Sequence, residues 1–163
     1  MVARTKKKTE AAAGKLPWPP MLFATALIWA YWFSFSWPVP LLPEGGGLGL
    51  DFAGASLVVL GVATVTGAAS QLRRAGTAIS PAEPTKKIVH TGLYGLSRNP
   101  IYAGMAAILA GIAILLNSAW YLAGLAGFVV LVTLLAIRRE EAYLEGKFGL
   151  QYTSYRDRVR RWL

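Results

Sequence analysis

Four long apolar stretches, separated by polar ones, dominate the pattern of the chain. They span residues 20–42, 50–71, 100–117 and 118–137, and apart from Asp51 none of them holds a charged residue. About 20 helical residues cross a hydrocarbon core of roughly 30 Å. A charged side chain at the centre of such a helix would cost about 2.5–3.5 kcal/mol. The pattern therefore predicts an all-α membrane protein with about four transmembrane helices.

The charged residues sort onto one side of these predicted helices. All 17 lysines and arginines lie within residues 4–15, 73–98 or 138–161, whereas the connections 41–51 and 116–120 contain none. Cytoplasmic loops of membrane proteins carry an excess of lysine and arginine. We therefore expect both termini and the connection 72–99 in the cytoplasm, and the protein in a bacterial inner membrane.

The composition narrows the classes of function. The formal charge is +9, but the basic residues are spread along every expected cytoplasmic edge, which favours contact with anionic lipids over nucleic-acid binding. The chain has no cysteine, which excludes thiol and zinc-thiolate chemistry, and His90 is its one histidine. No second histidine or cysteine completes a metal site, so we expect no metal. The spread of the basic residues and the apolar stretches make a lipid bilayer the expected partner.

We expect one domain in three parts. Residues 1–16 form a basic flexible tail, 17–71 hold the first two helices, and 72–163 hold the long connection, the last two helices and a C-terminal segment. Small residues recur on one face of the second and third helices, where they allow close helix packing in lipid. They are Gly54, Gly61 and Ala68 on the second helix and Gly104, Ala107 and Gly111 on the third.

A short turn joins the third and fourth stretches, so these helices should be antiparallel neighbours. Asn99 and Pro100 suit the N-cap and first residue of the third helix. The hairpin then brings Arg98 to the depth of residues 138–141. The last helix should continue into the cytoplasm as far as Phe148, followed by a short basic amphipathic segment. A polar site is thus expected beside a helix N-terminus, which favours an anionic group.

Two motifs on this hairpin resemble the isoprenylcysteine carboxyl methyltransferase and phospholipid methyltransferase family. The first runs "GLYGLSRNPIYAG" and the second "EEAYLEGKFGLQYTSY". The matching positions are Gly92, Tyr94, Arg98, Asn99, Pro100, Tyr102 and Gly104, then Glu140, Glu141, Leu144, Phe148, Gly149, Tyr152 and Tyr155. Asn99 stands where many relatives have histidine, and Arg160 where proline is usual. The first two helices carry no family motif.

The resemblance implies an integral membrane methyltransferase that uses S-adenosylmethionine and acts on a lipid or lipophilic acceptor. It implies a cofactor pocket formed by His90, Gly92, Leu93, Tyr94, Asn99, Pro100, Tyr102, Glu140 and Glu141. Catalytic roles fall on Arg98, Arg139 and Glu140, and contact with the acceptor on Arg98, Tyr152 and Tyr155. One glutamate would hold the ribose hydroxyls or the amino group, while the helix N-terminus takes the carboxylate.

Other functions remain open from the sequence. A phospholipid amine or another small lipophilic acceptor suits four spans better than a prenylcysteine. The membrane sterol and ene reductases, which use NADPH, have a similar C-terminal motif. A non-catalytic membrane adaptor that keeps the fold is the third possibility.

Overall fold

The computed structural model describes residues 19–43, 47–79 and 84–163, and these ranges contain helices and no strand. The expected tail, residues 1–16, lies outside them. The helices are α2 (Pro19–Ser36), α3 (Gly47–Arg74), α4 (Leu93–Leu96), α5 (Pro100–Leu115), α6 (Ala119–Val132), the π-helix η1 (Thr133–Ile137), α7 (Arg138–Phe148) and α8 (Leu150–Arg158). The four long helices fall on the four apolar stretches, so the all-α prediction is confirmed.

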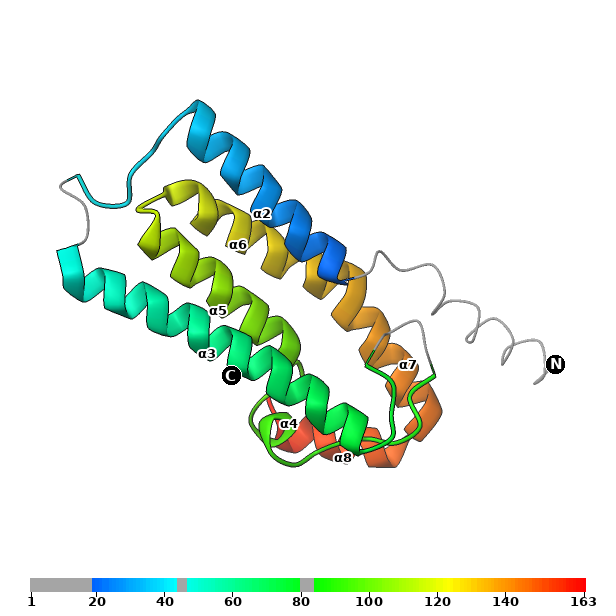
Figure 1. Cartoon of the computed structure of the whole chain (residues 1–163). Helices are drawn as coiled ribbons and strands as arrows, with labels where there is room; N and C mark the ends of the chain where they lie inside the picture. The colour runs from blue at the N-terminus through cyan, green and yellow to red at the C-terminus, as the bar shows by residue number, and fades with distance from the viewer. Residues whose placement is uncertain (1–18, 44–46, 80–83) are drawn as a thin grey trace.

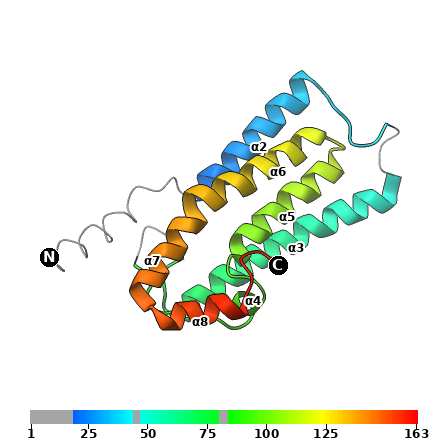
Figure 2. The same cartoon turned by 180° about the vertical axis from the view of Figure 1, so that it is seen from behind.

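The long helices lie side by side in the order α2, α6, α5, α3 (Figure 1). The reverse view shows the same order, with α4 and α8 gathered at one end of the row (Figure 2). Two helices of the described chain are long and apolar enough to cross a membrane, α3 and the continuous helix Ala119–Phe148, while α5 is shorter. The count of four spans and the cytoplasmic termini stay predictions.

Glycines set the close approach of α3 and α5. A Cβ added to Gly61 would lie 2.6 Å from the carbonyl oxygen of Gly104, and one added to Gly111 would lie 2.6 Å from that of Gly54. Real Cβ atoms do not come so near, so only glycine lets these backbones touch. Ala68 is also buried on the same face of α3. The packing role expected for these small residues is confirmed.

Helix α2 ends at Ser36, earlier than the apolar stretch that predicts it. Pro38 and Pro40 follow closely, and proline lacks the N–H that a helix needs and restricts the residue before it. The chain after them folds onto the turn between α5 and α6. There the side-chain amide of Asn117 accepts from Leu42 N and donates to Leu42 O, both at 2.9 Å.

The last long helix runs beyond the apolar stretch, as predicted. One π turn, η1, precedes the charged start of α7, and the hydroxyl of Thr133 donates to the carbonyl oxygen of Val129 (2.6 Å). Such a bond competes with the regular helical ladder. Gly149, with φ +53°, ends α7, and α8 folds back beneath α3 and α5 (Figure 2).

Candidate active site

An ion pair joins the two sequence motifs. Arg98, two residues before α5, places Nη1 3.1 Å from Oε1 of Glu141 on α7, and the two side chains are only 10% and 16% exposed. The α5–α6 hairpin brings these residues together, as its short turn predicted. Removing two charges from water costs free energy, which the attraction between them has to offset. The pair joins α7 to the residue two positions before α5.

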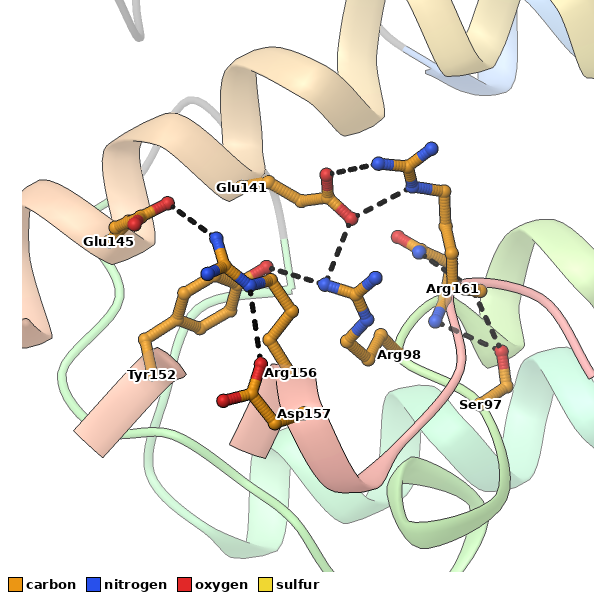
Figure 3. A network of polar contacts seen from close by, with 9 residues as sticks. Ser97, Arg98, Glu141, Glu145, Tyr152, Arg156, Asp157 and Arg161 are labelled. Carbon is orange, nitrogen blue, oxygen red and sulfur yellow. Dashed lines mark hydrogen bonds and ion pairs between the residues drawn. The ribbon is translucent and has the colours of Figure 1, made fainter. Parts of the chain in front are cut away.

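Glu141 has a second cationic partner from the end of the chain. Arg161 donates from Nε to Oε1 at 3.0 Å and from Nη2 to Oε2 at 2.8 Å (Figure 3). Two parallel bonds between a guanidinium and a carboxylate form the strongest common type of protein hydrogen bond. One carboxylate thus lies between two arginines, and this group of three, Arg98, Glu141 and Arg161, keeps a net positive charge.

The neighbouring Glu140 has different surroundings. Its Oε2 accepts a 3.4 Å hydrogen bond from the hydroxyl of Tyr102, and no arginine neutralises it within the described residues. Glu140 belongs to the charged part of the last helix, beyond the apolar residues that could span a membrane. Burial raises the pKa of Glu140 to about 7, the charge on Glu141 acts in the same direction, and the bond from Tyr102 opposes both. Glu140 therefore keeps its proton to a higher pH than an ordinary carboxyl group does.

Two buried tyrosines of α8 support this cluster. Tyr152 accepts a hydrogen bond from Nη1 of Arg98 at 3.4 Å, and Tyr155 donates one to the carbonyl oxygen of Tyr94 at 2.7 Å. Burial raises the pKa of the Tyr94 and Tyr155 phenols above their ordinary value, so both stay neutral. Helix α8 thus holds Arg98 and α4 in place together.

A cavity lies between the start of α5, α7 and the connection after α3. Its empty space, which includes open solvent at the mouth, is about 680 Å³. Apolar side chains make one part of its wall: Leu72, Ala78, Ile79, Ile88, Val89, Ile101 and Leu144. Polar, charged and other residues make the rest: Thr85, Lys87, Tyr94, Arg98, Asn99, Pro100, Tyr102, Glu140 and Tyr155. Such a lining suits a ligand that has both charged groups and an apolar body.

The predicted site residues fall into three groups. Those that line the cavity are Tyr94, Arg98, Asn99, Pro100, Tyr102, Glu140 and Tyr155. Glu141 and Tyr152 lie behind the wall and bond to Arg98. His90, Gly92, Leu93 and Arg139 are not part of the lining, and of these His90, Gly92 and Arg139 are exposed.

Gly92 has a backbone role beside the site. Its φ is +57°, and a Cβ there would collide with the side-chain amide of Gln71. The same amide accepts a hydrogen bond from Leu93 N at 3.2 Å. The end of α3 is thereby tied to the start of α4, which carries Tyr94.

Asn99 occupies the N-cap position that the Asn-Pro pair predicted, but its side chain does not cap α5. Instead Nδ2 donates to the carbonyl oxygen of Arg161 at 2.9 Å. The C-terminal segment crosses the N-terminus of α5 and brings its backbone oxygen within hydrogen-bond distance of this amide.

Sequence reasoning missed two charged residues of the site. Lys87 lines the cavity, and Arg161 neutralises Glu141. Both belong to basic runs that read as solvated charges, and neither is in the two motifs. Their separation from Glu141 along the chain, 54 and 20 residues, gives no local signal.

Three comparisons with known proteins bear on the site. The family model described as PEMT, phospholipid methyltransferase, matches residues 50–151, which is more than half of the chain. That range holds every residue of the cavity wall except Tyr155. A Haemophilus influenzae protein described as uncharacterized is 36% identical over 63 residues, which are 39% of this chain and all of that protein. No solved structure matches the chain.

Proposed function

Because this chain belongs to the phospholipid methyltransferase family, we propose that it transfers a methyl group from S-adenosylmethionine to a lipid or another lipophilic acceptor. Membership in the family makes the chain a membrane methyltransferase, and its long apolar helices agree with integration in a bilayer. The proposal concerns the cofactor, the acceptor and the residues that bind them.

One observation carries the proposal. The cavity lies at the end of the apolar helices α3 and α5, and its wall combines Arg98 and Glu140 with seven apolar side chains. A charged, water-soluble cofactor needs the polar part of such a wall, and a lipid acceptor needs an apolar approach. The wall of this one cavity offers both.

The residues of the wall fit S-adenosylmethionine, which carries a carboxylate, an ammonium group and ribose hydroxyls. Nε of Arg98 is buried and has no hydrogen-bond partner among the described residues, so it is available for a carboxylate. The Glu140 carboxylate suits the ammonium group or the ribose hydroxyls. Tyr94 and Tyr102 would lie against the adenosyl group. Asn99 and Pro100 bring the N-terminus of α5, whose dipole favours an anion.

When bound, S-adenosylmethionine supplies an electrophilic methyl group. Its transfer is an in-line displacement, so the task of this chain is to orient the two reactants and exclude water. Arg98 is held by Glu141 and Tyr152 and therefore presents a fixed guanidinium to the cavity. If the acceptor is a protonated amine, a base must take its proton, and Glu140, with its pKa of about 7, is suited to that role.

The acceptor class is a further part of the proposal. We propose a phospholipid amine or another small lipophilic acceptor in preference to a prenylcysteine, with Arg98 and Tyr155 on its path. Tyr152 would act through Arg98. Arg139 is exposed and His90 lies outside the wall, so we assign neither a role in the transfer.

Lipid analysis tests this function. Membranes that contain the protein are incubated with methyl-labelled S-adenosylmethionine, and their lipids are analysed by mass spectrometry. We expect a labelled lipophilic product that is absent with the E140A variant and present with the R156A variant, because Arg156 lies in an exposed ion pair away from the cavity. The same labelled species in membranes without the protein, or none with the folded protein, would reject the proposal.

A further inference from the structure

The last residues of the chain form a strap across the start of α5. Three hydrogen bonds tie the backbone of this strap, residues 159–162, to residues 97–99. Arg98 N donates to Arg160 O at 2.9 Å, and both Asn99 Nδ2 (2.9 Å) and Ser97 Oγ (3.3 Å) donate to Arg161 O. Trp162 packs against the apolar core. The strap therefore has a defined place in the fold.

The strap places the Arg161 guanidinium on Glu141. Its two bonds, 3.0 and 2.8 Å, engage both carboxylate oxygens (Figure 3). Oxygen Oε1 of Glu141 also lies 3.1 Å from Nη1 of Arg98. Arg161 therefore limits the rotation of the carboxylate that holds Arg98.

Neither Arg161 nor Glu141 belongs to the cavity wall, whereas Arg98 does. Arg161 also lies beyond residue 151, where the match to the family model ends. An effect of Arg161 on ligand binding must therefore pass through Glu141 or through the strap as a whole. These two routes make different predictions.

We infer that Arg161 is a positioning residue, which fixes Arg98 for ligand binding by holding Glu141 in a single orientation. This inference rests on the proposed function, because the ligand that reports on Arg98 is S-adenosylmethionine. The inference goes beyond the proposed function because it makes the C-terminal strap part of the site. Arg161 needs the planar fork of a guanidinium for this role, since a lysine ammonium cannot engage both oxygens in the same way.

A double-mutant cycle separates the two routes. The full chain is purified in detergent as wild type, R161Q, E141Q and R161Q/E141Q, and the Kd for S-adenosylmethionine is measured by calorimetry. We expect each single variant to bind about tenfold more weakly, the size of one lost charge-assisted hydrogen bond. The double variant should bind no more weakly than E141Q alone, because Arg161 acts through Glu141.

A second ion pair provides the matched control. Arg156 Nη1 lies 2.8 Å from Glu145 Oε2, between α8 and α7, but these side chains are 39% and 46% exposed, and within the described residues no hydrogen bond or ion pair joins them to Arg98. R156Q should bind S-adenosylmethionine with the wild-type Kd. R161K keeps the charge without the fork, so its Kd should lie between those of wild type and R161Q. This milder variant decides the question if R161Q does not fold.

The outcomes are distinct. Additive effects of R161Q and E141Q, or wild-type binding by R161Q, would overturn the inference and leave the proposed function in place. If R161Q is unfolded, wild-type binding by R161K would overturn it equally. Absence of saturable binding by the folded wild type would remove the proposed function itself, and the inference with it.

Discussion

The hydroxyl of Tyr155 donates a 2.7 Å hydrogen bond to the carbonyl oxygen of Tyr94, which links α8 to α4. Both tyrosines line the cavity, and Tyr155 is 5% exposed. Nothing in local sequence requires this contact between residues 61 positions apart. Helix α8 therefore helps to shape the part of the cavity wall that α4 provides.

Loss of this hydroxyl should destabilise the protein. Y155F leaves a buried carbonyl oxygen without its donor, which costs about 1–3 kcal/mol. We expect a lower midpoint of thermal unfolding, followed by circular dichroism in detergent. Y143F is the control, because among the described residues the Tyr143 hydroxyl bonds only to Lys147, at an exposed position. Equal midpoints for wild type and Y155F would show that the bond contributes nothing.

The contact between α3 and α5 should tolerate no side chain at Gly61. In G61A the new Cβ would meet Gly104 O at 2.6 Å, so the helices must separate. Overpacking of this kind costs about 1–3 kcal/mol. Thermal unfolding should therefore occur at a lower temperature than in wild type. G127A, on α6, adds the same atom where no other atom lies within 4 Å, and it should match or exceed wild-type stability. Equal unfolding temperatures for G61A and G127A would contradict the close contact between α3 and α5.

The stability of the protein should depend on pH through Glu140. Its pKa is raised from 4.5 to about 7 in the folded protein, so the folded state keeps a proton that the unfolded state loses between these values. Glu140 therefore lowers stability as pH rises from about 4.5 to 7, and the loss is complete above pH 7. E140Q, which is always neutral, should unfold at a higher temperature than wild type at pH 8.5 and at nearly the same temperature at pH 4.5. A constant difference at both values would contradict the raised pKa.

Much of the fold could be predicted because a lipid bilayer limits the length and the charge of the helices that cross it. The long helices and the antiparallel hairpin follow from apolar length and from the turn at residues 116–118. The extension to Phe148 follows from the helical spacing of Glu140, Leu144 and Phe148. The hairpin in turn brings Arg98 level with Glu141. The end of α2 follows from proline chemistry: apolar residues continue to residue 42, but the helix ends at Ser36, just before Pro38 and Pro40.

The rest of the site depends on contacts that no periodicity encodes. Lys87 and Ile88 reach the cavity only because the connection after α3 folds against α5. The strap that carries Arg161 is held by backbone oxygens, which any sequence would provide. Asn99 is an informative case: its type predicted a cap, and the fold uses its amide for the strap instead.

The most direct measurement is a titration of the purified full chain with S-adenosylmethionine, for wild type, R98Q and R156Q. Arg98 is the cavity residue whose Nε lacks a partner among the described residues, and in R98Q Glu141 still pairs with Arg161, so the fold should survive. We predict saturable binding by wild type and R156Q, and binding by folded R98Q that is weaker by about tenfold or more. No saturable binding by folded wild type, or an unchanged Kd for R98Q, would contradict the assignment of this cavity as the cofactor site.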